Sequence, residues 1–391
     1  MAVLQVSLLA VAVLGVFAPR LPNWLVPAFV AAVLLLSGEL TVGAGWDALR
    51  PLMAPLAFLL LAVPLAVMLD RIGFFEAAAS LMDRGRDPRR GLWIMAAAVT
   101  TFLNLDASVV LLTPLYIRLA RRNGLDAGLI AFQPVLLACL ASSALPISNL
   151  TNLIAADTLD LGIEDFLVHL GPASLAAVVV GWLGYRRLPA AAAAVPPVRE
   201  PVDRRALYQG LPVVVFVILG FTVGDALGVK AWIVALIADI VLVAMTRDLH
   251  LGDIPWSAAG LATGLGLVAT TAAPHLGLEN IFAGQGWVTQ LRTALFAIVA
   301  ADTINNLPAL LISLPGLQSG SEHIWPLLFG VNFGPVLVLH GALAGLLWRS
   351  TAARLEVQVS PWEYTKTGVR VGTPALLVGL AIVVVTDVVL H

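Results

Sequence analysis

Charged side chains are scarce in this chain. They make up 12% of its 391 residues, roughly half the share found in soluble proteins. Hydrophobic residues make up 60%, and the mean hydropathy is +0.95. Many apolar runs approach the length of a membrane-spanning helix, about 20 residues, and the alternating pattern of an outer-membrane barrel is absent. The sequence therefore predicts an all-α polytopic membrane protein, with such runs at 52–69, 167–185, 211–223 and 374–389.

Cysteine is nearly absent as well, and Cys139 is the only one. A single cysteine excludes an internal disulfide and any site in which three thiolates of this chain hold one ion. No H-E-x-x-H, G-x-S-x-G or P-loop motif occurs. A net charge of −2 without a basic tail gives no reason to expect nucleic acid as a partner. We therefore expect no catalytic site, no metal and no cofactor.

Lysine is rare too, since only Lys230 and Lys366 occur among 22 basic residues, so arginine must indicate the orientation in the membrane. Arginine clusters precede and follow the apolar block 92–119, and both are expected on the cytoplasmic side. If this block crossed the membrane once, the two clusters would lie on opposite sides. We therefore predict a re-entrant hairpin over about 91–120. Polar residues at its centre favour this reading, because irregular backbone at membrane depth must face protein or a cavity. The clusters are Arg71, Arg84, Arg86, Arg89 and Arg90 before the block, and Arg118, Arg121 and Arg122 at its end and just after it.

The next segment, about 125–156, is rich in serine, asparagine and threonine and contains Pro146, which predicts a broken helix. An acidic loop follows, which we expect outside the cell. Arg186 and Arg187 then mark a cytoplasmic linker over 188–206, with the first repeat covering 1–187.

The second half, 207–391, repeats this order of features, with a hairpin expected over about 290–315 and a broken helix over about 322–348. Each half has three helices before its hairpin, so the second half starts on the opposite face of the membrane. The sequence thus predicts two inverted five-helix repeats with two re-entrant hairpins, two broken helices and about ten spanning helices. Such repeats place the binding site at the membrane midplane, between the hairpins and the helix breaks.

Four segments concentrate the polar residues expected in the membrane: 101–106, 148–152, 302–308 and 330–335. They carry mostly carboxamides and hydroxyls, which can bind a small polyhydroxy solute through hydrogen bonds. An aspartate in the bilayer is costly and is by default functional. We therefore expect proton-coupling roles for Asp106 and Asp302.

These segments carry a family resemblance. Phe-Leu-Asn-Leu-Asp at 102–106, Ser-Asn-Leu-Thr-Asn at 148–152, Asn-Asn-Leu-Pro at 305–308 and Gly-Val-Asn-Phe-Gly-Pro at 330–335 occur in one order along the chain. In this the chain resembles the bacterial arsenite permease family, within the ion-transporter superfamily.

The resemblance implies export of arsenite and antimonite from the cytoplasm, across the inner (plasma) membrane, in exchange for protons. In some members it also implies a soluble ATPase partner, for which the linker is the candidate docking site. Because Cys139 cannot supply three thiolates, the solute would have to be the neutral trihydroxide. Besides Asp106, the residues carried over to the site are Asn104, Ser148, Asn149, Asn152, Asn305, Asn306 and Asn332.

Other readings remain open from the sequence. Asn305 and Asn306 could form a turn, and Ser148, Thr151 and Asn152 could cap a helix. A sodium/proton antiporter or an organic-anion carrier of the same superfamily would use similar segments, although Asp106 and Asp302 argue against an anion. An intramembrane enzyme with an aspartyl pair is a remote alternative. The oligomeric state is not determined by these features.

Overall fold

The computed structural model describes residues 2–16, 20–82, 88–189, 202–247, 250–317 and 323–390. Within these ranges the chain is helical, and no β-strand occurs. The prediction of an all-α polytopic protein is confirmed. Most of the predicted linker 188–206 lies outside the described residues, as do Arg84 and Arg86 of the first arginine cluster.

The first half contains these helices: α1 (Ala2–Val16), α2 (Leu25–Leu36), α3 (Val42–Arg71), α4 (Phe74–Met82), α5 (Pro88–Phe102), α6 (Leu105–Arg122), α7 (Ala127–Leu140), η1 (Pro146–Ser148), α8 (Leu150–Leu159), α9 (Ile163–His169) and α10 (Gly171–Tyr185). The second half contains α11 (Arg204–Ala226), α12 (Ala231–Thr246), η2 (Leu251–Asp253), α13 (Trp256–Ala272), η3 (Ala273–His275), α14 (Glu279–Phe282), α15 (Trp287–Ile304), α16 (Asn306–Ser313), η4 (Leu314–Gly316), α17 (Ile324–Phe333), η5 (Gly334–Val336), α18 (Leu343–Arg354) and α19 (Pro361–Leu390).

Few single helices are long enough to cross a membrane alone. Among the described residues, α3, α11 and α19 meet the length and hydropathy of a span, and α9 with α10 forms a fourth if this pair, bent by 49°, is one span. Six further apolar stretches have 10–17 residues. The predicted number of ten spanning helices therefore remains a prediction, because it requires short and broken helices to be counted as spans.

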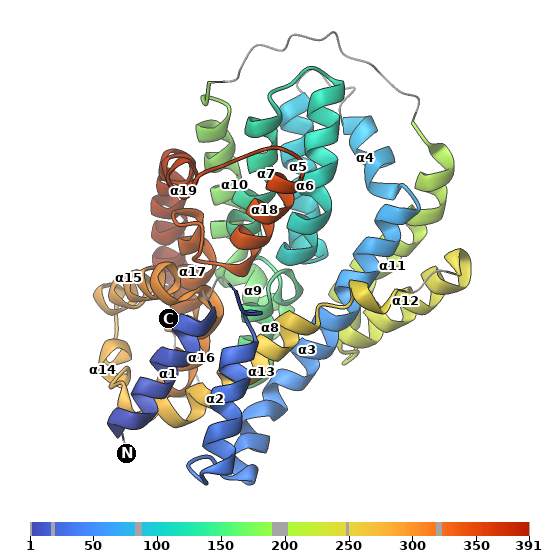
Figure 1. The fold of residues 1–391 in the computed structure, drawn as a ribbon. Helices are drawn as coiled ribbons and strands as arrows, with labels where there is room; N and C mark the ends of the chain where they lie inside the picture. Colours follow the sequence, from blue (N-terminus) through green and yellow to red (C-terminus); the bar gives the residue numbers. More distant parts are fainter. Residues whose placement is uncertain are drawn as a thin grey trace.

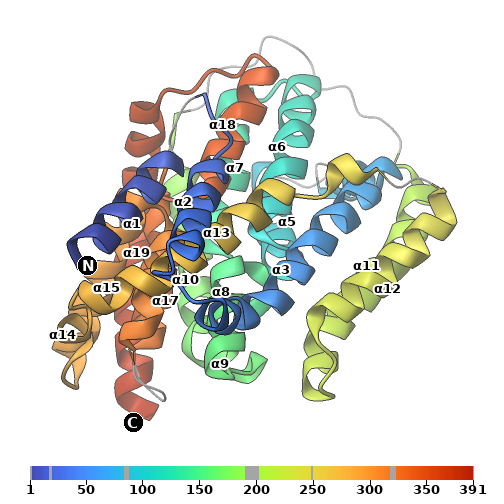
Figure 2. The same cartoon turned by 60° about the horizontal axis from the view of Figure 1, so that its bottom comes forward.

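The helices form two groups (Figures 1 and 2). In one, α3 packs against α12 and α13, α2 against α1 and α13, and α11 against α4 and α12. In the other, α7 packs against α5 and α6, α15 against α16 and α17, and α19 against α10 and α17. Helices from the two halves of the sequence pack together in both groups, so neither half is a separate body.

The pair α5 and α6 is antiparallel and is interrupted at Leu103 and Asn104. Near the interruption, the hydroxyls of Thr100 and Ser108 lie 2.7 Å apart. Further away, the Tyr116 hydroxyl donates to the carbonyl of Leu92 at 2.5 Å. Contacts between residues at increasing distance from the interruption define a hairpin, whose placement in a membrane stays a prediction.

Two helices are broken near their middle. Helix α7 ends at Leu140, and the chain passes through η1 before α8 begins. Helix α17 likewise passes into η5 and an irregular stretch before α18. Proline at 146 and at 335 lacks the N–H that a continuous helix would need. Both breaks expose main-chain groups that a side chain or a solute must satisfy.

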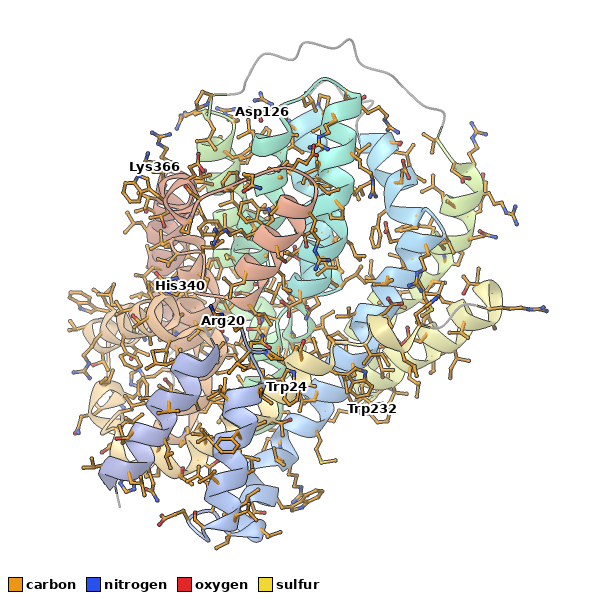
Figure 3. The ribbon with its side chains drawn as sticks, in the orientation of Figure 1. Arg20, Trp24, Asp126, Trp232, His340 and Lys366 are labelled. Carbon is orange, nitrogen blue, oxygen red and sulfur yellow. The ribbon has the colours of Figure 1, made fainter. Side chains whose placement is uncertain are left out.

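Two aromatic side chains form hydrogen bonds to backbone carbonyls of the broken helices. Trp348 of α18 donates its indole N–H to the carbonyl of Ala131 of α7 at 2.6 Å. The Tyr364 hydroxyl of α19 donates to the carbonyl of Pro335 at 3.0 Å. Figure 3 shows His340 at mid-height in the bundle, with Asp126 and Lys366 toward one end. The second break is therefore fixed by neighbours from both halves.

Candidate functional site

Four helices begin at one place inside the bundle. The first turns of α6, α8, α16 and α18 line a single cavity of about 30 Å³, closed on a further side by α13. Two of these helices follow the hairpin interruptions and two follow the helix breaks. Each helix start carries unpaired N–H groups and a partial positive charge. The described residues that line the cavity are Leu105, Asp106, Asn149, Leu150, Thr151, Ala258, Leu261, Asn305, Asn306, Leu307, Ala342, Leu343 and Ala344.

Asparagine caps three of the four helices. The side-chain oxygen of Asn104 accepts from the N–H of Asp106 at 2.8 Å, and that of Asn149 accepts from Thr151 at 3.2 Å. The side-chain oxygen of Asn305 accepts from Leu307 at 3.4 Å. Asparagine is among the best N-cap residues because its short side chain reaches the N–H two residues ahead.

A buried network ties the first break to the second half of the chain. The side-chain oxygen of Asn332, on α17, accepts from Asn149 at 2.9 Å and from Thr151 at 2.6 Å. The amide nitrogen of Asn332 donates to Asn152 at 2.6 Å. All four side chains are at most 2% exposed. Asn332 therefore acts as a bridge that holds α8 against α17.

The remaining predicted residues of the first half lie behind the cavity. Asn152 also donates to the carbonyls of Ser142 and Leu145, each at 3.0 Å. The Ser148 hydroxyl donates to the carbonyl of Leu145 at 2.7 Å, and the Asn104 amide donates to that of Ile147 at 3.5 Å. These side chains bond to the backbone around the first break. They are not among the described residues that line the cavity, so in this conformation they affect a solute only through the shape of the break.

The second hairpin tip is joined to the second break through main-chain contacts. The N–H of Asn306 donates to the carbonyl of Gly341 at 2.8 Å, and the Asn305 side chain donates to the carbonyl of His340 at 3.1 Å. Asn305 has φ 81° and ψ 149°, a combination found almost only in glycine, so its backbone is strained. The side chain of Asn305 stabilises this conformation through its hydrogen bonds with His340 and Leu307.

The two predicted proton carriers differ in position. Asp106 lines the cavity and is the one ionisable side chain among the described lining residues. Asp302 lies one turn before Asn305 and packs against Gly341, where an added Cβ would come within 2.8 Å of its carboxylate oxygen. That oxygen is buried and has no hydrogen-bond partner among the described residues. The structure thus brings Asp106, Asn149, Asn305 and Asn306 together and places Asp302 behind the second break.

Some residues of this region escaped the sequence analysis as site residues. Thr151 lines the cavity, and its position between Asn149 and Asn152 was a usable signal. Ala342 and Ala344 line it with backbone and methyl groups, which leave no polar signal in a sequence. Away from this site, Asp239 on α12 is a further buried acid, 7% exposed, and it is not among the described residues that line either cavity.

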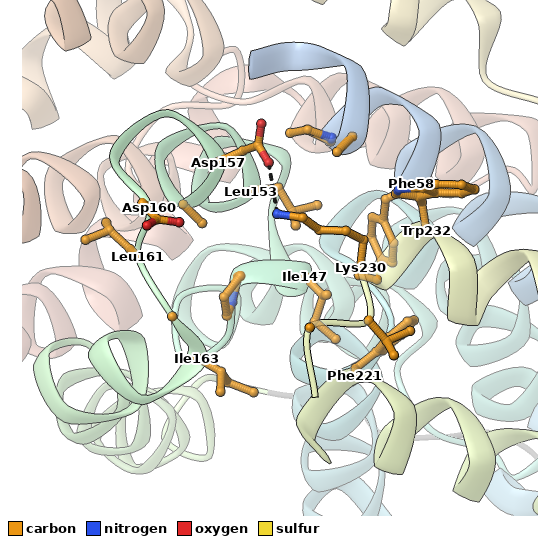
Figure 4. Close-up of a pocket in the computed structure, with 18 of the residues that line it drawn as sticks. Phe58, Ile147, Leu153, Asp157, Asp160, Leu161, Ile163, Phe221, Lys230 and Trp232 are labelled. Atoms are coloured by element: carbon orange, nitrogen blue, oxygen red, sulfur yellow. Dashed lines mark ion pairs between the residues drawn. The ribbon is translucent and has the colours of Figure 1, made fainter. Parts of the chain in front are cut away.

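A second, larger cavity of about 470 Å³ lies between α3, η1, α8 and the α11–α12 connection (Figure 4). Its wall includes the acidic loop that is predicted to face outward, with Asp157, Asp160 and Glu164. Lys230 forms an ion pair with Asp157 at 3.5 Å across this space. The cavity reaches Ile147 of η1, whose carbonyl contacts Asn104 at the first hairpin tip. One residue of η1 therefore lies between this cavity and the first hairpin tip.

Broken helices that meet at a cavity with several asparagines and one aspartate in its lining, within an apolar bundle, are typical of secondary transporters. Residues 8–334 match the family model described as citrate transporter. The chain belongs to this family of membrane transporters and is not an enzyme.

The names of curated relatives agree with the assignment to membrane transporters. The arsenical pump membrane protein of Escherichia coli K12 is 26% identical over 354 residues, covering 81% of this chain and 82% of the relative. That of Yersinia enterocolitica is 27% identical over 403 residues, covering 90% of each. The predicted resemblance to arsenite permeases is confirmed. Among solved structures, the Alcanivorax borkumensis YdaH transporter matches with a TM-score of 0.49 and 15% identity, covering 91% of this chain and 88% of that one.

Proposed function

We propose that the protein exports arsenite and antimonite from the cytoplasm across the inner (plasma) membrane in exchange for protons. The observation that carries this proposal is the small cavity at which four helix N-termini meet one carboxyl group, that of Asp106. The printed names of the curated relatives, arsenical pump membrane protein, support the solute. The transporter class itself follows from the family.

The lining favours a small neutral solute that bears hydroxyl groups. Helix N–H groups and asparagine amides donate to oxygen, and the carboxylate and amide oxygens accept from hydroxyls. A cavity of about 30 Å³ holds on the order of two water molecules, so it must widen to admit a trihydroxide with four non-hydrogen atoms and widen far more to admit a tricarboxylate. Cys139 is buried on α7 and is not among the described lining residues, so recognition rests on hydrogen bonds.

Asp106 couples the solute to protons in this proposal. When ionised, its carboxylate accepts a hydrogen bond from a hydroxyl of the solute. A proton that arrives from outside neutralises the carboxylate and weakens this hydrogen bond, so the solute leaves to the outside, and loss of the proton to the cytoplasm restores the binding state. Exchange requires such a difference in affinity between the two states.

The arrangement of the two halves also supports the proposed inverted repeats. In each half a hairpin pair, α5 with α6 or α15 with α16, precedes a broken helix, α7 with α8 or α17 with α18. Inverted repeats would give the cavity equivalent access from both faces of the membrane, which alternating access needs.

The test is uptake of radiolabelled arsenite into everted membrane vesicles with an acidic interior. We expect uptake that an uncoupler abolishes and that Asp106→Asn lowers at least tenfold, because an amide cannot exchange the proton. Asp302→Asn is compared in parallel, and Glu279→Gln, at an exposed position, is the control for loss of one carboxylate. Uptake that is unaffected by Asp106→Asn but lost with Asp302→Asn would move the proton role to Asp302.

One observation favours a second function. The four positive helix ends would also bind an anion, and the family model is described as citrate transporter. The same vesicles are therefore tested with citrate. Citrate uptake without arsenite uptake would replace the arsenical proposal with that of an organic-anion carrier.

A further inference from the structure

A further cavity, of about 340 Å³, lies between the start of α7, the chain that leaves α10 and the first turns of α19. Asp126 and Lys366 both line it and lie toward the same end of the bundle (Figure 3). Arg186 and Arg187 directly follow α10, so we expect this end on the cytoplasmic side. None of its described lining residues belongs to either of the cavities discussed above.

Two cations of α19 line this cavity. Lys366 and Arg370 are four residues apart, so they lie on one side of the helix. The ammonium group of Lys366 lies 5.3 Å from the ring centroid of Trp362. Arg370 forms neither a hydrogen bond nor an ion pair with any described residue. Its guanidinium group therefore has no anionic partner within the described part of the chain.

The two acids that line the same cavity are engaged at helix starts. Asp126 accepts from the N–H of Leu129 at 3.0 Å. Glu363 accepts from the backbone N–H three residues before it at 2.8 Å. Carboxylates at such positions are balanced by the partial positive charge of the helix end. The charge of Glu363 also acts on Lys366, but neither acid forms an ion pair with Lys366 or Arg370 among the described residues. The positive charge of the cavity is therefore incompletely neutralised by the protein.

Helix α19 places these cations at the border of the bilayer. Its 30 residues are about 45 Å long, more than the hydrocarbon core of about 30 Å, so its first turns extend to the level of the headgroups. Trp362 is 64% exposed, which is typical of tryptophan at that level. Leu377 is also exposed and lies seven residues after Arg370, on the same side of the helix and about 10 Å deeper. A lipid whose headgroup contacts Arg370 can therefore lay an acyl chain along the apolar side of α19.

We propose that this cavity binds the phosphate group of an anionic phospholipid from the cytoplasmic leaflet. The guanidinium group of Arg370 donates to two phosphate oxygens, a geometry that suits arginine, and Lys366 adds a second positive charge. Thr367 and Gln358 line the cavity as further donors, and neither forms a hydrogen bond with any described residue. Basic pockets between helices on the cytoplasmic side are typical sites for anionic headgroups. The inference does not depend on which solute is transported.

The test is the thermal stability of the purified, delipidated protein in detergent, titrated with three probes. Dioleoyl phosphatidylglycerol is the anionic lipid, dioleoyl phosphatidylcholine is the lipid without net charge, and inorganic phosphate is the soluble source of the same group. We expect phosphatidylglycerol near saturation to raise Tm by about 2 °C or more, because a ligand of the folded state stabilises it. Phosphatidylcholine and inorganic phosphate should raise Tm much less.

Variants then assign the effect to the cavity. Arg370→Gln and Lys366→Gln should each raise the Kd for phosphatidylglycerol about fivefold, as the loss of one cation near an anionic headgroup should. Arg370→Lys keeps the charge but not the paired donors, so its Kd should lie between those of the wild type and Arg370→Gln. Arg354→Gln is the matched control, because it removes an exposed cation at the end of α18 that is not among the described lining residues. We expect it to bind as the wild type does.

Three results would overturn the proposal. Equal stabilisation of the wild type by the two lipids would show that the headgroup charge is not recognised. An equal response to inorganic phosphate would replace the lipid with a soluble phosphate compound. The same Kd for Arg370→Gln, Lys366→Gln and Arg354→Gln would show that the two cations of α19 only determine orientation in the membrane. Because the first two results come from the wild type alone, they decide the matter even if a variant fails to fold.

Discussion

Helices α8 and α18 follow the two helix breaks, yet their first turns are stabilised in different ways. The start of α8 is held by side chains of the protein itself, since Asn149 caps Thr151 and both bond to Asn332. The start of α18 has no side-chain cap and relies on Gly341 and on the tip of the second hairpin. The difference indicates that the first break is held mainly by side-chain hydrogen bonds and the second mainly by contacts of its main chain with the second hairpin tip.

The largest effect is expected from removal of the bridge at the first break. Asn332→Ala leaves Asn149, Thr151 and Asn152 without a shared partner in a buried network, at a cost of about 2–4 kcal/mol. We expect Tm to fall by several degrees and uptake to be lost. Asn280→Ala, at an exposed position on α14, is the matched control. A Tm for Asn332→Ala within one degree of wild type would show that the network is not what holds α8.

A smaller effect should distinguish the two hairpin tips. Asn305 has φ 81°, where alanine is strained and glycine is not, whereas Asn104 has φ 162°, which any residue adopts. Asn305→Gly should therefore be more stable than Asn305→Ala by about 1 kcal/mol. Asn104→Gly should be no more stable than Asn104→Ala. Thermal melting of the four variants measures this contrast, and an equal advantage for glycine at both tips would contradict it.

The smallest effect is expected at the ion pair in the larger cavity. The side chains of Lys230 and Asp157 are 64% and 25% exposed, and such pairs contribute about 0–1 kcal/mol. Lys230→Ala should shift Tm by less than two degrees, and added salt should remove the shift. A large, salt-independent loss of uptake would mean that the pair has a role in the transport cycle that its geometry does not indicate.

The sequence was informative where polar residues interrupt apolar runs. Asn104, Asn149 and Asn305 stand out in this way, and each starts a helix at the cavity. Their spacing could not reveal that Asn332 bonds back to the first break, because that contact joins residues about 180 positions apart. Nor could it show that Asp302 packs against Gly341 while Asp106 faces the cavity.

Other features leave little trace in a sequence. Ala342 and Ala344 line the cavity with backbone and methyl groups, and an alanine in an apolar run is unremarkable by composition. The division of 42–82 into α3 and α4 depends on Gly73, whose φ of 80° ends the longer helix. Backbone conformation of this kind is determined by packing, so a hydropathy pattern that predicts a helix there does not predict its interruption.

The most direct test of the account asks whether solute and proton compete for Asp106 in the central cavity. Arsenite is added to the purified protein in weakly buffered detergent solution at a pH where the carboxyl is partly protonated, and the change in pH is recorded. We predict that binding releases up to one proton per protein and that Asp106→Asn releases none. Equal proton release by the Asp106→Asn variant, or arsenite binding to the wild type without any release, would contradict the account.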